Sequence, residues 1–149
     1  MSDAAAEIRE HLHHFGGRPC VALANTIVWR RGEARDLFGA YGDVLRWSVA
    51  VGTLAEADAA ALAARAEADP AAAERALARV RGVRELLYRV FAAVAADEEV
   101  APDDLRLLND AVGSALAHAG DSPAGGGYGW VFRDAGGDLD APASRKTQP

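Results

Sequence analysis

Cysteine is almost absent from this sequence. Cys20 is the only cysteine among 149 residues, so an intramolecular disulfide and a multi-cysteine zinc site are both excluded. No apolar run approaches the ~18 residues of a membrane-spanning helix, and the N-terminal stretch has no basic leader followed by an apolar segment. From these absences we expect a cytoplasmic protein with no metal in its fold and no membrane partner.

Aromatic residues and positive charge are also scarce. Aromatics make up 7% of the chain, and its hydrophobic fraction of 50% is largely alanine, which predicts helices that pack closely across small side chains. Sixteen basic residues against 22 acidic ones give a net charge of -6. That balance opposes binding to phosphate backbones or anionic lipid, so we expect no direct DNA binding by this chain.

Helix-ending and helix-starting signals divide the middle of the chain. Gly52 follows an apolar stretch at the position of a helix end. Thr53 and Glu56 form a capping-box pattern that predicts the start of the next helix. Asp69 followed by Pro70 predicts a further start, with aspartate as N-cap and proline at the first helical position.

Two apolar stripes follow. The helix that begins at Pro70 is predicted to be the central one, and the helix opened by Pro102 and ended by Gly120 is predicted to pack antiparallel to it. The first stripe consists of Leu77, Val80, Arg84, Leu87, Phe91 and Val94, and the second of Leu105, Leu108, Val112 and Leu116.

The two ends of the chain have weaker patterns. Ile8, Leu12 and Phe15 fit an N-terminal helix, but the two glycines after them equally allow a strand. Residues 19–29, "PCVALANTIVW", also allow either a helix, started by proline, or a strand, because of their β-branched residues. The residue pattern leaves both choices open.

Residues 128–132, "YGWVF", alternate in the manner of a strand. A lone strand needs a partner for its backbone groups, and we predict that residues 10–15 supply it. The predicted fold is therefore mainly α, an antiparallel helical domain over residues 1–138 with a small two-stranded β element joining the N- and C-terminal ends. Residues 139–149 are expected to be a flexible tail.

Arg84 is the most informative polar residue, because it falls on the apolar stripe of the central helix. A buried guanidinium needs a carboxylate, several carbonyls or a ligand anion. Asn25, Trp29 and Tyr88 are candidates to line a ligand-binding pocket with it, Trp29 forming an aromatic wall. The alternative is an internal hydrogen-bond network that fixes helix register and binds nothing, which is the commoner use of buried polar residues.

Other residues with potential chemistry are better explained structurally. The histidines at positions 11, 13 and 14 have no carboxylate or cysteine at a recognisable ligand spacing, so we expect them on the surface rather than at a metal. Cys20 is expected to be buried as a small apolar side chain. Arg81 and Glu85 are predicted to form a surface ion pair on a helix. No cofactor is predicted.

Four segments resemble, in order and spacing, the ABATE domain of bacterial CGNR zinc-finger proteins, from about Phe15 to Pro142. They read "GGRPCVALANTIVWRRG", "DLFGAYGDVLRWSVAVGTL", "VRGVRELLYRVFAAVA" and "GGGYGWVFRDAGGDLDAP". Those proteins are described as stress-induced transcription regulators with a mostly helical domain followed by a cysteine-rich module for zinc and DNA. The resemblance implies that "ALANT" is helical and that the glycine-aromatic segment is a strand.

The resemblance does not extend to that cysteine-rich module. After "DLDAP" the chain reads "ASRKTQP", and Cys20 alone cannot supply the thiolates of a zinc finger. We therefore expect a non-enzymatic regulatory, ligand-sensing or dimerisation domain of a transcription regulator, without its own DNA-binding zinc finger. The expected partners are a small-molecule effector and either a second copy or a full-length family member. The alternative is a small enzyme that uses the polar cluster around Arg84.

Overall fold

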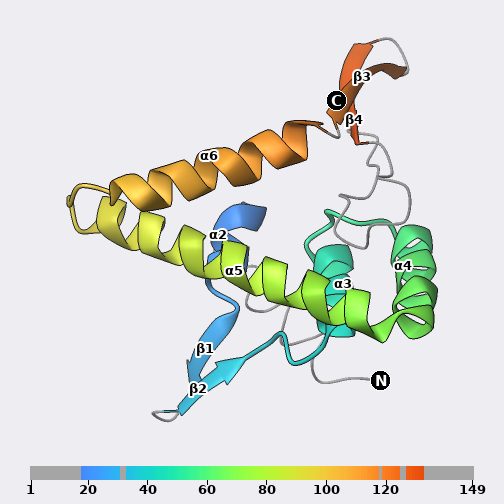
Figure 1. Cartoon of the computed structure of the whole chain (residues 1–149), viewed down its shortest axis with the longest axis horizontal. Coiled ribbons are helices and arrows are strands. Elements are labelled where there is room, and N and C mark those ends of the chain that lie inside the picture. The colour runs from blue at the N-terminus through green and yellow to red at the C-terminus, as the bar shows by residue number, and fades with distance from the viewer. Residues whose placement is uncertain (1–17, 31–32, 118, 125–126, 133–149) are drawn as a thin grey trace.

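The computed structural model describes residues 18–30, 33–117, 119–124 and 127–132, and this part of the chain is mainly helical (Figure 1). The elements are α2 (Pro19–Ala24), β1 (Ile27–Arg30), β2 (Glu33–Asp36), α3 (Tyr41–Ala50), α4 (Glu56–Ala68), α5 (Pro70–Ala95), α6 (Pro102–Ala117), β3 (Ala119–Ala124) and β4 (Gly127–Phe132). The predicted fold class, mainly α with a small antiparallel β element, is confirmed. The predictions for residues 8–15 and 139–149, including the three histidines, lie outside the described residues.

Helix α5 is central, as predicted. It contacts α2, α3, α4 and α6, and it crosses the middle of the molecule in Figure 1. Its start is also as predicted, because the Oδ1 of Asp69 accepts a hydrogen bond from the backbone N–H of Ala72 at 2.9 Å and Pro70 occupies the first turn. The α5–α6 pair forms the expected antiparallel hairpin (Figure 1).

The predicted apolar stripes are partly wrong. On α5, Leu77 and Arg84 are buried, but Val94 is 65% exposed while Leu86 and Val90, outside the stripe, are buried. The reason is that different neighbours cover α5 along its length, so no single face is buried throughout. On α6, three of the four stripe residues are also exposed, namely Leu105, Val112 and Leu116.

The core lies between α5 and the α3–α4 pair. Phe38 has no exposed surface, and its ring meets that of Trp47 edge to face, with centroids 5.7 Å apart and an interplanar angle of 80°. Ala73 and Ala76 are buried against this group, so α5 approaches closely across small side chains, as the alanine-rich composition predicts.

The turn between α3 and α4 differs from the predicted capping box. Gly52 has a φ of 73°, the left-handed conformation that glycine adopts after a helix end. Helix α4 begins at Glu56 without a side-chain cap, because the hydroxyl of Thr53 donates instead to the carbonyl of Ser48 at 3.1 Å. Thr53 therefore completes the end of α3 and does not cap α4.

The ambiguous segment "PCVALANTIVW" holds both a helix and a strand. Pro19 starts α2, which runs to Ala24, and Asn25 is its C-cap. The helix implied by the resemblance is thus right up to Ala24. The β-branched part forms β1, which pairs antiparallel with β2 so that Ile27 lies opposite Asp36.

The strand predicted at "YGWVF" is confirmed as β4, while its predicted partner, residues 10–15, lies outside the described residues. β4 pairs antiparallel with β3, with Ala119 opposite Phe132 and Ala124 opposite Gly127. A hairpin between adjacent segments closes a short loop and so costs less entropy than pairing with a distant segment. Gly120 accordingly lies in β3, and α6 ends at Ala117.

Within the described ranges, no helix combines the length and the apolar character that crossing a bilayer requires.

Candidate functional site

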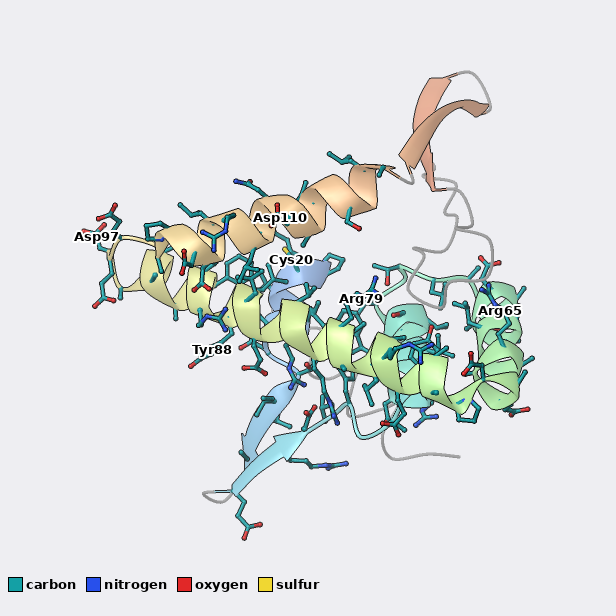
Figure 2. All side chains as sticks on the ribbon, in the orientation of Figure 1. Cys20, Arg65, Arg79, Tyr88, Asp97 and Asp110 are labelled. Atoms are coloured by element: carbon teal, nitrogen blue, oxygen red, sulfur yellow. The ribbon has the colours of Figure 1, made fainter. Side chains whose placement is uncertain are left out.

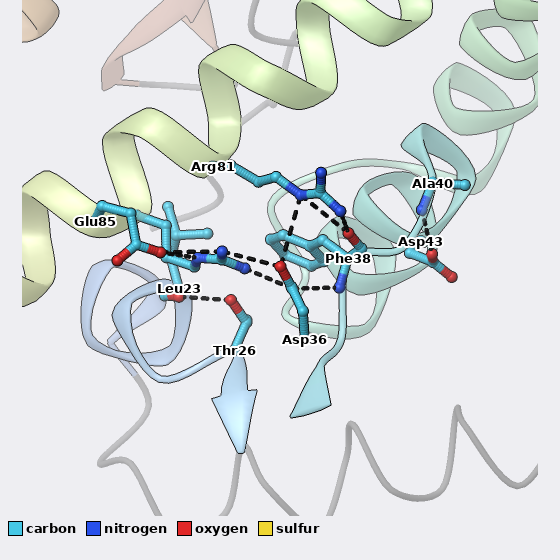
Figure 3. A network of polar contacts seen from close by, with 9 residues as sticks. Leu23, Thr26, Asp36, Phe38, Ala40, Asp43, Arg81 and Glu85 are labelled. Atoms are coloured by element: carbon cyan, nitrogen blue, oxygen red, sulfur yellow. Dashed lines mark hydrogen bonds and ion pairs between the residues drawn. The ribbon is translucent and has the colours of Figure 1, made fainter. Parts of the chain in front are cut away.

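The guanidinium of Arg84 lies in an ion-pair cluster with Asp36 and Glu85, two residues that Figure 3 labels. The residue is 4% exposed. Its Nη1 donates to Oδ1 of Asp36 at 2.6 Å and its Nη2 to Oδ2 at 3.0 Å, while Nε donates to Oε1 of Glu85 at 3.0 Å. The requirement predicted for a buried arginine is therefore met by two carboxylates of the chain itself.

Asp36 lies at the end of β2 and holds the segment that leads to α3. Its Oδ1 also accepts the backbone N–H of Phe38 at 2.9 Å. Arg81 reaches the same segment, with Nε 3.1 Å from the carbonyl oxygen of Phe38 and 3.6 Å from Oδ2 of Asp36. Two arginines of α5 thus tie the β2–α3 connection to the central helix.

The predicted ion pair between Arg81 and Glu85 is wrong. Both residues have other partners, since Arg81 donates to the carbonyl of Phe38 and Glu85 binds Arg84. The tertiary contacts offered by the β2–α3 connection outweigh a pair along the helix surface, which is worth only about 0.5 kcal/mol.

The cluster lowers the pKa of Asp36. Burial acts to raise that pKa, but the hydrogen bonds from Arg84 and from the Phe38 backbone, together with the charges of Arg84 and Arg81, outweigh it. The same pairing raises the pKa of Arg84 against the effect of its burial. The two groups therefore stay ionised, and Arg84 also lies over the Phe38 ring, 5.9 Å from its centroid.

Two of the other three candidate ligand-binding residues, Asn25 and Tyr88, form no hydrogen bond with Arg84. The side-chain amide of Asn25 donates to the carbonyl of Val21 at 2.9 Å, which completes the end of α2. Tyr88 is 57% exposed, and the side chain of Trp29 lies outside what the structure describes. Among the described residues, the hydrogen-bonding partners of Arg84 are Asp36 and Glu85.

Cys20 is exposed, so the prediction of a buried thiol is wrong. It occupies the first turn of the short helix α2 (Figure 2). Helix α2 instead buries Ala22 and Ala24, since a six-residue helix offers only a narrow side to its neighbours. Among the residues in the described ranges, no group of three or more His, Cys, Asp or Glu side chains is placed to hold a metal ion.

A groove of about 380 Å³ lies between α3 and α4. Sequence reasoning did not find it, because its shape comes from small side chains that have no chemical signature. Its lining residues are Gly42, Leu45, Arg46, Val49 and Ala50 on α3, and Glu56, Ala59 and Ala63 on α4. Its volume falls within the range of about 300 to 1,000 Å³ that is usual for small-molecule sites.

Two opposite charges border this otherwise apolar groove. Arg46, whose side chain is 62% exposed, forms an ion pair with Asp43 one turn earlier in α3. Its guanidinium extends back over Gly42, where a Cβ would come 3.5 Å from Nη1. Glu56 is the first residue of α4. The groove therefore offers an apolar wall, one exposed cation and one carboxylate.

Comparison with known proteins gives one family. The model of the ABATE family, whose description reads "Putative stress-induced transcription regulator", matches residues 17–146. The matched range contains both the cluster around Arg84 and the groove between α3 and α4. No curated protein and no solved structure was found to match the chain.

Proposed function

Because the chain belongs to the ABATE family of stress-induced transcription regulators, we propose that it is a non-enzymatic regulatory domain that senses a small molecule in the groove between α3 and α4. The groove itself is the observation that carries the proposal. It combines a suitable volume with an apolar lining and few polar groups, which is the usual composition of a ligand site.

The cluster around Arg84 supports a structural role instead. Its guanidinium already has two carboxylate partners, so binding a substrate anion would first require breaking a buried ion pair. The side of Asp36 that accepts these bonds is turned toward α5. We therefore favour the regulatory function over an enzyme that acts through Arg84.

The lining of the groove favours a mainly apolar ligand with one acidic group. Leu45 and Val49 supply the apolar surface. Arg46 is exposed, and its ion-pair partner among the described residues is Asp43, one turn away. A surface pair of this kind is weak enough to exchange for a ligand carboxylate or sulfonate.

Two dyes that share an apolar frame test this proposal. The anionic dye 1-anilinonaphthalene-8-sulfonate and the neutral N-phenyl-1-naphthylamine both fluoresce more strongly in apolar surroundings. We expect saturable binding of both by the wild-type chain. Replacing Ala63→Leu fills the groove, so it should weaken the binding of both dyes by roughly tenfold or more.

Two comparisons make the test specific. Ala64→Leu introduces the same side chain on an exposed position of α4 that does not line the groove, and it should leave binding unchanged. Arg46→Gln should weaken the anionic dye more than the neutral one. Equal binding by the Ala63→Leu and Ala64→Leu variants would show that the dyes bind elsewhere, and the proposed site would be wrong.

A further inference from the structure

An apolar face of α6 is open to solvent. Leu105, Val112 and Leu116 recur at steps of seven and four residues, so they lie on one side of the helix. Their exposed fractions are 45%, 49% and 53%. The half-buried residues Leu108 and Ala111 mark the side of α6 that turns toward α5. The packing of α6 on α5 therefore leaves a continuous apolar strip of α6 exposed to solvent.

This face carries no charge. Between the three apolar residues it presents Asn109 and Gly113, and the charged residues of α6 lie on its other sides. These charged residues are Asp103, Asp104, Arg106 and Asp110. An uncharged apolar strip on an otherwise acidic protein is typical of an interaction surface rather than of a solvated helix face.

Gly113 borders the strip in the middle of α6. A Cβ at this position would meet no heavy atom within 4 Å, so the packing of this chain does not require glycine there. Glycine inside an exposed helix is less stable than alanine. Because glycine has no side chain, it allows another backbone to approach α6 closely at this position.

We propose that this face of α6 binds the same face of a second copy of the chain, in an antiparallel twofold arrangement. In such a contact both copies use the same surface, so a charged residue on the strip would lie near the same charge on the partner and be repelled. Because the strip is uncharged, this repulsion does not arise. A pairing centred between residues 110 and 111 places Leu105 against Leu116 of the partner subunit.

The area of the strip sets the strength of the contact. A helix of 16 residues is about 24 Å long and about 10 Å wide, so the contact covers only a few hundred Å² on each copy. A stable interface uses about 800 Å² per partner. We therefore expect a reversible dimer with a dissociation constant on the order of 10⁻⁴ M.

Sedimentation velocity of the full chain, from about 10 μM to about 1 mM, measures this association directly. Reductant is included so that the exposed Cys20 does not link two copies. The wild-type chain should form more dimer as its concentration rises. Leu105→Glu should remain monomeric over the whole range, because each interface would then bury two unpaired carboxylates.

Leu107→Glu is the matched control. Leu107 lies two residues away on the same helix and is 48% exposed, but it points to a different side. This variant should associate as the wild type does. Circular dichroism of both variants checks that each stays folded.

A second pair of variants tests the close approach without adding charge. Gly113→Ala and Gly82→Ala each add one methyl group where nothing lies within 4 Å, so both should raise the thermal midpoint of the monomer. Only Gly113→Ala should weaken association, by roughly fivefold or more. A wild-type chain that is monomeric at the highest concentration, or equal effects of the two leucine variants, would overturn the proposal. Neither result bears on dye binding to the groove, which involves only α3 and α4.

Discussion

Arg84 and Asp36 meet through two parallel hydrogen bonds, Nη1 to Oδ1 at 2.6 Å and Nη2 to Oδ2 at 3.0 Å, although 48 positions separate them in the chain. The arginine is buried, while the carboxylate is about one-third exposed, with a side-chain exposure of 32%. This geometry fixes the start of the β2–α3 connection on the central helix. Together with the bond from Arg81 to the carbonyl of Phe38, this fork-shaped contact therefore helps to place α3, and with it one wall of the groove.

Replacing Asp36→Ala should lower the free energy of unfolding by roughly 2 to 3 kcal/mol, because a buried guanidinium loses its main partner. This expected loss of stability is smaller than the loss from breaking a fully buried ion pair, because Asp36 is partly exposed and Glu85 still binds Arg84. Urea melts measure the change. Asp110→Ala, on an exposed position of α6, should change stability by less than about 0.5 kcal/mol. Equal effects of the two variants would contradict a stabilising role for the pair.

The contribution of Asp36 should disappear in acid. Its pKa in the folded chain lies below the ordinary value of 3.8, so the folded state holds the proton less tightly than the unfolded state. The stabilisation is complete well above pH 3.8 and is lost as pH falls through the folded pKa. The difference in unfolding free energy between wild type and Asp36→Asn should therefore narrow below about pH 4. Urea melts between neutral pH and pH 2 test this, and a constant difference would contradict it.

Truncating Phe38→Ala should cost about 3 to 5 kcal/mol, because the ring is fully buried and packs edge to face on Trp47. The loss would also leave the guanidinium of Arg84 without the ring beneath it. Leu107→Ala, at a half-exposed position, should change stability very little. Thermal and urea melts of both variants give the comparison, and a mild Phe38→Ala phenotype would mean that the core lies elsewhere.

Removing the cap of α5 should have a measurable but smaller effect. Asp69→Ala should lower stability by about 1 kcal/mol, since the N–H of Ala72 loses its acceptor. Asp69→Ser should restore most of this. Thr53→Ala should cost less, because its hydroxyl donates to an exposed carbonyl at the end of α3 and caps no helix. A larger loss from Thr53→Ala than from Asp69→Ala would reverse this assignment.

We also expect the chain not to bind duplex DNA selectively. The prediction follows from its net charge of -6, which opposes contact with phosphates. Gel-shift titrations against mixed promoter fragments, at low and moderate salt, should show at most a weak association that salt removes. A sequence-selective complex would contradict the prediction.

Local signals allowed much of the helical fold to be predicted. The start of α5 depends on Asp69 and Pro70, and the end of α3 on Gly52, so neighbouring residues alone determine them. The predicted capping box was wrong because the Thr53 hydroxyl had two possible partners nearby, the start of α4 and the end of α3. The local pattern does not indicate which of them it binds. Local pattern likewise identified β4 as a strand but not the strand beside it.

The partner of Arg84 could not be predicted in the same way. The residue pattern indicated that something must satisfy this buried arginine, but any of 22 acidic residues was a candidate. Only the tertiary fold selects Asp36. The groove was harder still, because Gly42 and Ala63 contribute to it by being small, and small residues are common throughout this chain.

The exposure of Cys20 has a practical consequence. Since it is the only cysteine in the chain and its side chain reaches solvent, a maleimide reagent will attach at one known position without any prior mutation. The label will sit on α2, which packs against α5. A dye attached at Cys20 will therefore detect conformational changes near the central helix in a protein whose sequence has not been altered.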